Sequence, residues 1–157
     1  MVYRSLAEHL ESTDATHTID GIVMGELIPA TDSCWLLDLE CIVGTGNYVD
    51  VLKNMERITR GKLSFENVRD YVDIEEGVAW LEFDHEGQAY RLDLLAENDW
   101  IDPQFFTLLS EITADRKDNY RFTQFNGDGG QEMIFGFESP ESLNKIVAAT
   151  GLEFEWL

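Results

Sequence analysis

The chain has 157 residues, 44% of them hydrophobic and 11% aromatic, and its 31 acidic and 11 basic side chains give a formal net charge of −20. This length and hydrophobic content predict one globular domain, residues 1–157, and exclude a disordered acidic tail. The charge excludes direct binding of nucleic acid or of an anionic membrane, because both need clustered lysine and arginine, and it favours a cationic protein as partner.

The first third of the chain combines two helical and two extended patterns. Apolar residues at helical spacing predict helices over 3–11 and 47–59, and Gly61 lies just beyond the second, where helices commonly end. Strands are expected at 18–27 and 34–43, with a loop between them. No apolar run approaches the ~20 residues of a membrane span, and the start lacks a signal-peptide pattern, so we expect a cytoplasmic protein.

The middle of the chain is rich in strand patterns. One strand is expected at 64–74 and a hairpin at 78–95, where apolar residues alternate with Trp80 and Glu82. Gly87 fits a type I turn followed by a bulge. The hairpin is therefore expected to have one apolar face and one charged face, with Trp80 on the charged one.

The last third of the chain repeats the mixture of helix and strand. A helix is expected at 103–114, strands at 120–125 and 131–137, a helix at 139–151, and an edge strand within 152–157. This order predicts an α+β fold, with a mixed, largely antiparallel sheet and about four helices packed mainly on one side.

Three short motifs have features of binding sites but are explained better as turns or caps. "IVGTGNYVDVL" has Gly44 and Gly46 before a helix, yet it lacks the third glycine of a dinucleotide-binding turn. "FNGDGGQE" lacks the closing glutamate of a calcium loop and is predicted to be a hairpin turn. Asp102, directly before Pro103, is predicted to be the N-cap of the helix at 103–114.

Residues that often carry catalysis or bind metals are sparse. Cys34 and Cys41 lie in the apolar run "CWLLDLECIV", where cysteine usually acts as a small core residue. His9, His17 and His85 are isolated from one another and from any partner at metal-ligand spacing. Because nucleophile motifs are also missing, we predict no catalytic residue, no metal and no cofactor, and we expect a protein that is not an enzyme.

Acidic residues are concentrated in the stretch 66–102, where twelve carboxylates are opposed by two arginines. Protein-binding surfaces use a rigid aromatic anchor surrounded by polar groups, which makes Trp80 and Trp100 the expected anchors. The predicted partner-binding residues are Glu75, Glu76, Trp80, Glu82, Asp84, Asp93, Glu97, Asp99 and Trp100.

The segment "VRDYVDIEEGVAWLEFDHEGQAYRLDLLAENDWIDP", residues 68–103, with the later "GGQEMIFGF" and "SPESL", resembles small acidic immunity proteins of bacterial polymorphic-toxin and contact-dependent growth inhibition systems. The likeness covers roughly the C-terminal two-thirds of the chain. It implies a cytosolic antidote that binds one toxin domain, often a basic nuclease, and blocks its active site or substrate groove. The resemblance assigns no individual site residue.

Charge, the missing catalytic motifs and the resemblance together predict a non-enzymatic immunity protein, a monomer or weak homodimer, that neutralises a cognate basic toxin domain, expected to be a nuclease. One alternative is a DNA mimic, which would carry acidic pairs spaced like phosphates. Another is a small carboxylate-based enzyme, which would hold buried acids with raised pKa in a deep pocket. The third is an adaptor subunit, which would expose a large apolar patch.

Overall fold

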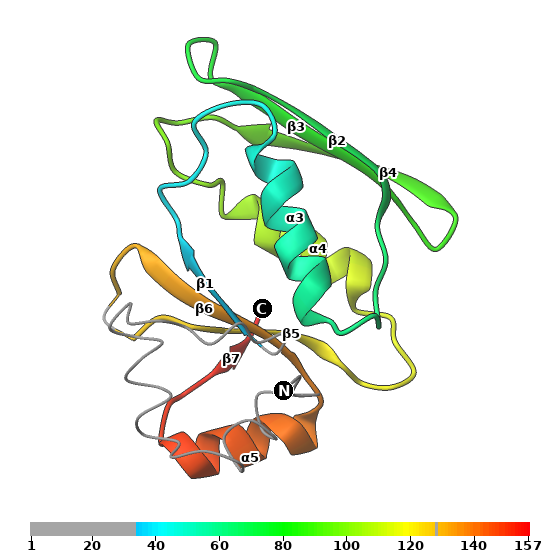
Figure 1. The fold of residues 1–157 in the computed structure, drawn as a ribbon, viewed down its shortest axis with the longest axis vertical. Helices are drawn as coiled ribbons and strands as arrows, with labels where there is room; N and C mark the ends of the chain where they lie inside the picture. Colours follow the sequence, from blue (N-terminus) through cyan, green and yellow to red (C-terminus); the bar gives the residue numbers. More distant parts are fainter. Residues whose placement is uncertain (1–33, 128) are drawn as a thin grey trace.

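The computed structural model describes residues 34–127 and 129–157, so the helix expected at 3–11 and the strand expected at 18–27 lie outside the described residues. Figure 1 labels the elements in chain order. They are β1 (Cys34–Asp38), α3 (Asn47–Ile58), β2 (Glu66–Asp73), β3 (Val78–His85), β4 (Gln88–Leu95), α4 (Gln104–Thr113), β5 (Arg121–Phe125), β6 (Glu132–Glu138), α5 (Pro140–Thr150) and β7 (Glu155–Trp156).

The described strands form two antiparallel sheets, which confirms the α+β class and corrects the expectation of one mixed sheet. Strands β2, β3 and β4 form a three-stranded meander in that order. The other sheet has four strands in the order β1-β6-β5-β7. Every pairing among the described strands is antiparallel.

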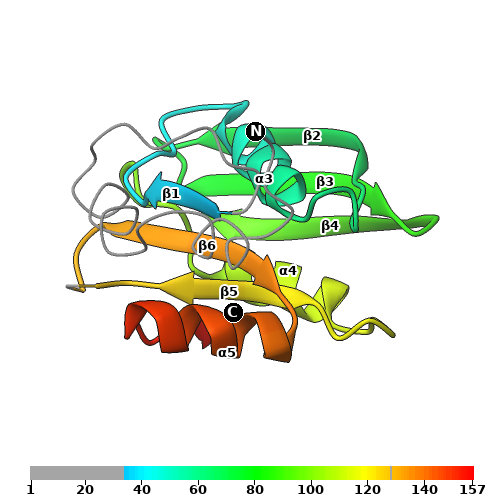
Figure 2. The ribbon, with the colours of Figure 1, turned by 60° about the horizontal axis from the view of Figure 1, so that its bottom comes forward.

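The elements stack in four layers, as Figure 1 shows, and the turned view of Figure 2 shows α5 beside β5. Helices α3 and α4 lie between the two sheets, and α5 covers the opposite face of the four-stranded sheet. Strand β6 explains this placement, because it is apolar on both sides. Phe135 and Phe137 pack into the large core with α3 and α4, whereas Ile134 packs with Leu143 and Ile146 of α5. The described residues hold three of the about four expected helices, and these cover both sides of the larger sheet instead of mainly one.

Local sequence patterns account well for α3 and for the β3–β4 hairpin. The predicted apolar stripe of α3 is buried, and it comprises Tyr48, Val51, Leu52, Met55 and Ile58. The hairpin turn consists of Glu86 and Gly87, which both have positive φ, 51° and 78°. Two such residues form a type I′ turn, which suits the strand twist, so the expected type I turn with a bulge is wrong.

Strand β1 ends at Asp38, five residues before the predicted end at 43. The chain turns there because the Asp38 carboxylate accepts a hydrogen bond from the Glu40 amide at 2.9 Å. The apolar residues beyond it then pack without pairing as a strand: the Ile42 amide donates to the Asp99 carbonyl at 2.8 Å. Among the described residues, no helix has the length and hydropathy that crossing a membrane requires.

Candidate functional site

The face of the three-stranded sheet that points away from α3 and α4 collects most of the unusual side chains, and we call it the outer face. Burial alternates along β3, so that Ala79, Leu81 and Phe83 point inward and are buried while the residues between them point outward. The outer face consists of Arg69, Tyr71 and Asp73 from β2, Val78, Trp80, Glu82 and Asp84 from β3, and Ala89, Arg91, Asp93 and Leu95 from β4.

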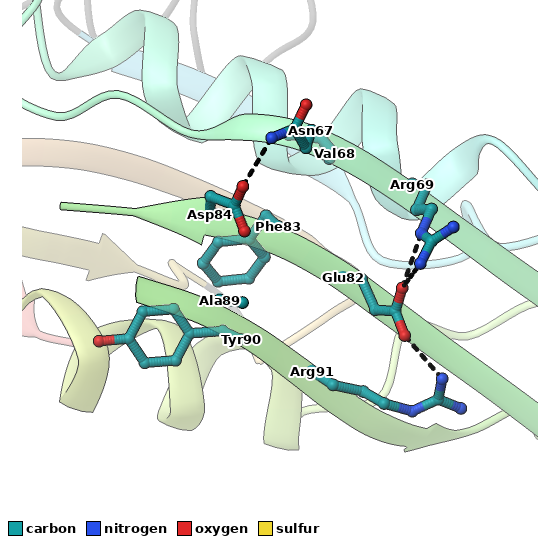
Figure 3. A pocket seen from close by; sticks show the side chains of 9 residues that line it. All are labelled: Asn67, Val68, Arg69, Glu82, Phe83, Asp84, Ala89, Tyr90 and Arg91. Carbon is teal, nitrogen blue, oxygen red and sulfur yellow. Dashed lines mark hydrogen bonds and ion pairs between the residues drawn. The ribbon is translucent and has the colours of Figure 1, made fainter. Parts of the chain in front are cut away.

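Glu82 lies at the centre of the outer face and pairs with two arginines, one on each neighbouring strand (Figure 3). Arg69 is paired with it at 2.6 Å from Nη2 to Oε2 and donates a second bond from Nε at 2.7 Å. Arg91 donates from Nη1 to Oε1 at 2.8 Å, and its Nε donates to Asp93 at 2.9 Å. The register places all three side chains in one row, because Glu82 is the partner of both Arg69 and Arg91.

Trp80 is flanked by two side chains from the neighbouring strands. Tyr71, its register partner on β2, stacks on it with ring centroids 6.1 Å apart and an interplanar angle of 22°. From the β4 side the Arg91 guanidinium lies 4.7 Å from the ring centroid. The indole is therefore held in place on an exposed sheet face, and it remains partly open to solvent.

Hydrogen bonds on the outer face favour the ionised forms of Glu82 and Arg91. The hydrogen bond from Arg91, assisted by Arg69, lowers the pKa of Glu82. Asp93 and then Glu82 raise the pKa of Arg91. The Tyr71 hydroxyl donates to Asp73 at 3.2 Å, and this hydrogen bond raises the pKa of the phenol.

An open groove of about 670 Å³ runs over the same strands. Asp84 stands on one side of it and accepts a hydrogen bond from the Asn67 side chain at 2.6 Å. The groove is lined by Asn67, Val68, Arg69, Glu82, Phe83, Asp84, Ala89, Tyr90 and Arg91 (Figure 3). Its openness suits a side chain or strand of another protein better than a small substrate that must be shielded from water.

Exposed apolar side chains border Trp80 at the end of the sheet near the β2–β3 turn. Val78 is 47% exposed and pairs with Leu95, which is 62% exposed. Ile74 begins the turn and is also exposed. Glu75 and Glu76 follow in the turn, so acidic groups lie beside this apolar margin. An apolar patch with an acidic border is the composition of a protein-binding surface.

The structure brings together only part of the predicted partner-binding set. Trp80, Glu82, Asp84 and Asp93 share the outer face, and the two turn glutamates lie at its end. The remaining three residues, Glu97, Asp99 and Trp100, lie in the segment between β4 and α4.

Trp100 belongs to a different surface from Trp80. It is 41% exposed and lines a separate groove of about 550 Å³ together with Leu39 and Phe106. The Asp102 carboxylate holds this segment by accepting from the amides of Leu95 at 2.8 Å and Gln104 at 2.9 Å. The second bond reaches the first residue of α4, but Pro103 holds the N-cap position, one residue after the predicted Asp102. The turn leads the chain from β4 toward the helix behind the sheet.

The sequence analysis missed Tyr71, Arg69 and Arg91 as members of the site. The two arginines were counted only as opposing charge, although they flank the one glutamate at the centre of the face. The available signal was the hairpin alternation, which puts Arg91 in phase with Asp93. Tyr71 requires the β2–β3 register, and that register includes a shift between Glu66 and Arg69 that the pattern does not reveal.

The glycine turn before α3 is occupied by a carboxylate of the chain itself. Asp70 of β2 accepts hydrogen bonds from the backbone amides of Gly46 at 2.7 Å, Tyr48 at 2.9 Å and Val49 at 3.2 Å. Gly46 has φ of 102°, which favours glycine. Since these amides are the groups that would hold a phosphate, the turn has a structural role, as the missing third glycine predicts.

Other unusual residues of the described part of the chain also have structural roles, whereas His9 and His17 lie outside it. Asn126 ties the β5–β6 turn through its side-chain bond to the Gly130 carbonyl, and this confirms the predicted hairpin. His85 is buried at the end of β3, with Nδ1 3.0 Å from the Ser64 carbonyl. Burial raises the pKa of Cys34 to about 12 and that of Cys41 to about 11, so neither thiol is poised as a nucleophile.

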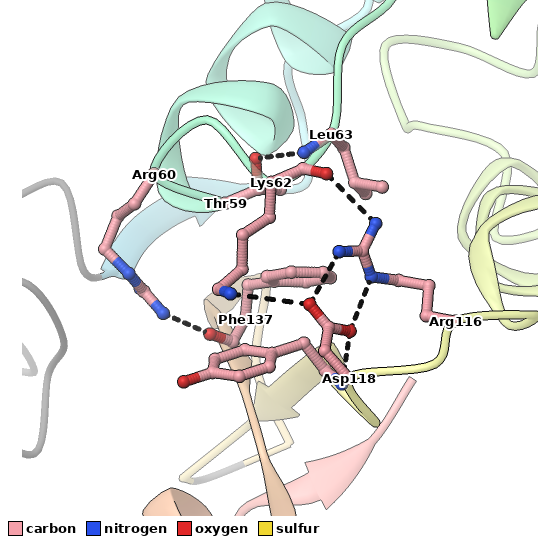
Figure 4. Close-up of polar contacts among 8 residues, drawn as sticks. Thr59, Arg60, Lys62, Leu63, Arg116, Asp118 and Phe137 are labelled. Carbon is pink, nitrogen blue, oxygen red and sulfur yellow. Dashed lines mark hydrogen bonds and ion pairs between the residues drawn. The ribbon is translucent and has the colours of Figure 1, made fainter. Parts of the chain in front are cut away.

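A second polar cluster joins the end of α3 to the loop before β5 (Figure 4). Arg116 holds Asp118 through two bonds of 3.0 and 2.8 Å and also donates to the Lys62 carbonyl at 3.0 Å. The Lys62 ammonium lies 3.4 Å from Asp118 and 4.0 Å from the centre of the Tyr120 ring. The hydrogen bond from Arg116 is the main reason that the pKa of Asp118 is lowered to about 2. These bonds link the end of α3 to the loop before β5.

No match to this chain is found among models of protein families, curated proteins or solved structures. Across residues 34–127 and 129–157, no group of three or more His, Cys, Asp or Glu side chains is arranged to hold a metal ion.

Proposed function

We propose that the protein is a non-enzymatic immunity protein, which binds a cationic toxin domain in the cytoplasm and neutralises it. The toxin is proposed to be a nuclease, because a nuclease groove is lined by the lysines and arginines that hold phosphates. The observation that carries the proposal is Trp80, stacked on Tyr71 and ringed by charged groups on an exposed sheet face. Family resemblance and the net charge of −20 support the same class.

Recognition on this face would combine two effects. The excess of carboxylates draws in a cationic partner and raises the association rate. Tight binding comes from a few desolvated anchors near the centre of an interface of about 800 Å² per partner. Trp80 and Tyr71 supply rigid aromatic surface for this purpose, and Val78 and Leu95 add apolar area beside them.

Two alternatives fit the outer face less well. A DNA mimic needs rows of carboxylates open to the partner, whereas Glu82 at the centre is already paired with two arginines. A carboxylate enzyme needs an acid with a raised pKa, whereas the pKa values of Glu82 and Asp118 are both lowered. These observations favour a protein-binding role.

The first test is inhibition of the cognate toxin domain. We expect equimolar protein to abolish its activity, and Trp80→Ala to weaken the complex by about 2 kcal/mol, or about 30-fold, as for a central aromatic anchor. Calorimetric titration of the toxin domain with each variant measures this loss.

Trp156→Ala is the matched control. Trp156 is also partly exposed and has Arg121 near its ring at 6.0 Å, but it lies on β7 of the other sheet. We expect this variant to bind as tightly as the parent. A toxin domain that keeps full activity in equimolar protein contradicts the proposed function, and equal losses for the two variants would place the interface elsewhere.

A further inference from the structure

We propose that Trp80, Glu82 and Asp93 form an arginine-binding site, which the free protein fills with its own Arg91, and that an arginine of the partner displaces this side chain on binding. The inference rests on the proposed function and specifies the chemical group that the outer face recognises.

The groups around Arg91 form a preorganised site for a planar cation. The guanidinium lies 4.7 Å from the centre of the Trp80 ring, donates to Glu82 at 2.8 Å and donates to Asp93 at 2.9 Å. An aromatic face with two carboxylates around it is the set of groups that favours arginine over lysine, because the planar guanidinium can stack and donate in several directions together. Tyr71 fixes the indole from the β2 side, so the site is formed before a partner arrives.

Arg91 can leave this site at a small cost in free energy. Its side chain is 48% exposed and that of Asp93 is 78% exposed, so the pair is open to water. Exposed ion pairs of this kind contribute little to stability. Glu82 keeps its second partner when Arg91 leaves, since Arg69 is paired with the other carboxylate oxygen at 2.6 Å.

A partner arginine gains more from the same groups than Arg91 does. An interface removes water from the site, and a cation stacked on an aromatic ring is worth more when both are desolvated. Arg91 thus competes with a partner arginine for the same groups. Replacing Arg91 is therefore expected to strengthen binding of a partner arginine, while the other charged groups of the outer face stay the same.

The test compares Arg91→Gln with Arg69→Gln in the full chain, using hexa-arginine and hexa-lysine peptides as probes. Both variants lose one positive charge and one partner of Glu82, but only Arg91 lies over Trp80. We expect Arg91→Gln to bind hexa-arginine about threefold more tightly than Arg69→Gln does, the size of an exposed cation–π contact. Hexa-lysine should not distinguish the two variants.

The location of binding is read from the indole N–H signal of Trp80 in nitrogen-15 NMR spectra, assigned with Trp80→Phe. The signal should shift with hexa-arginine, and far-ultraviolet circular dichroism checks that each variant is folded. Arg91→Lys, which keeps the charge without the planar group, is expected to bind hexa-arginine with an affinity between those of the parent and Arg91→Gln.

Equal affinities of Arg91→Gln and Arg69→Gln for hexa-arginine, or a Trp80 signal that does not move, would overturn the arginine site. The proposed function would stand in that case as long as the protein still blocks its toxin domain. If the toxin domain stays active but the two variants still differ in their affinity for hexa-arginine, the immunity function is contradicted and the arginine site stands.

Discussion

Asp70 shows how one residue fixes the relation between a sheet and a helix. Its carboxylate accepts three backbone hydrogen bonds from the start of α3, although it belongs to β2. We expect Asp70→Ala to lower the free energy of unfolding by about 1–3 kcal/mol, because it leaves amides at a helix start without their acceptor. Asp70→Asn keeps one acceptor oxygen and should lose less. Urea denaturation measures both changes.

The control for Asp70 is Asp93→Ala, which removes an exposed carboxylate from the same sheet. A surface change of this kind is expected to stay within about 0.5 kcal/mol of the parent. If Asp70→Ala and Asp93→Ala were equally stable, the three hydrogen bonds at the helix start would have no net value. The same comparison also checks that the outer face can be altered without loss of the fold.

At the scale of elements, the charge of Asp118 links the loop before β5 to the end of α3. Its pKa is lowered from 3.8 to about 2, chiefly by the hydrogen bond from Arg116. A carboxyl group whose pKa is lower in the folded state than in the unfolded state stabilises the fold at pH values above its unfolded pKa. This contribution is lost as the pH falls through about 2. We expect Asp118→Asn to flatten the fall in stability between pH 4 and pH 2, as measured by urea denaturation at each pH. An unchanged slope in the variant would contradict the assignment.

Elements with a complete local sequence pattern were predicted with nearly their observed ends. The pairing of strands that lie far apart in the chain was not predicted. The stripe from Tyr48 to Ile58 specifies α3 by itself, and alternation specifies the β3–β4 hairpin. The end of β1 depends instead on a turn at Asp38 and on a contact with Gln131, far along the chain. The number of sheets depends on the pairing of β1 with β6, about which periodicity carries no information.

The candidate site shows the same division between local and long-range information. Trp80, Glu82 and Asp84 were placed on one face because strand alternation is local. Trp100 was grouped with them by nearness in sequence, yet the turn held by Asp102 leads its segment to another groove. Tyr71 was missed because its contact with Trp80 exists only across two strands.

At the scale of the whole molecule, charge is expected to act through its position as well as through its total. Glu75→Gln with Glu76→Gln changes the charge at the end of the outer face, and Glu153→Gln with Glu155→Gln makes the same change just before β7 and at its first residue. Both double variants raise the net charge from −20 by two units, so long-range attraction of a cationic toxin domain is reduced equally. The first pair alone also removes charge beside the proposed interface, and it should slow association by a further two- to threefold, about the effect of a rim charge. Stopped-flow association rates over a range of salt concentrations measure the difference, which should shrink as salt screens the field. Equal rates for the two double variants would mean that the outer face does not meet the partner first.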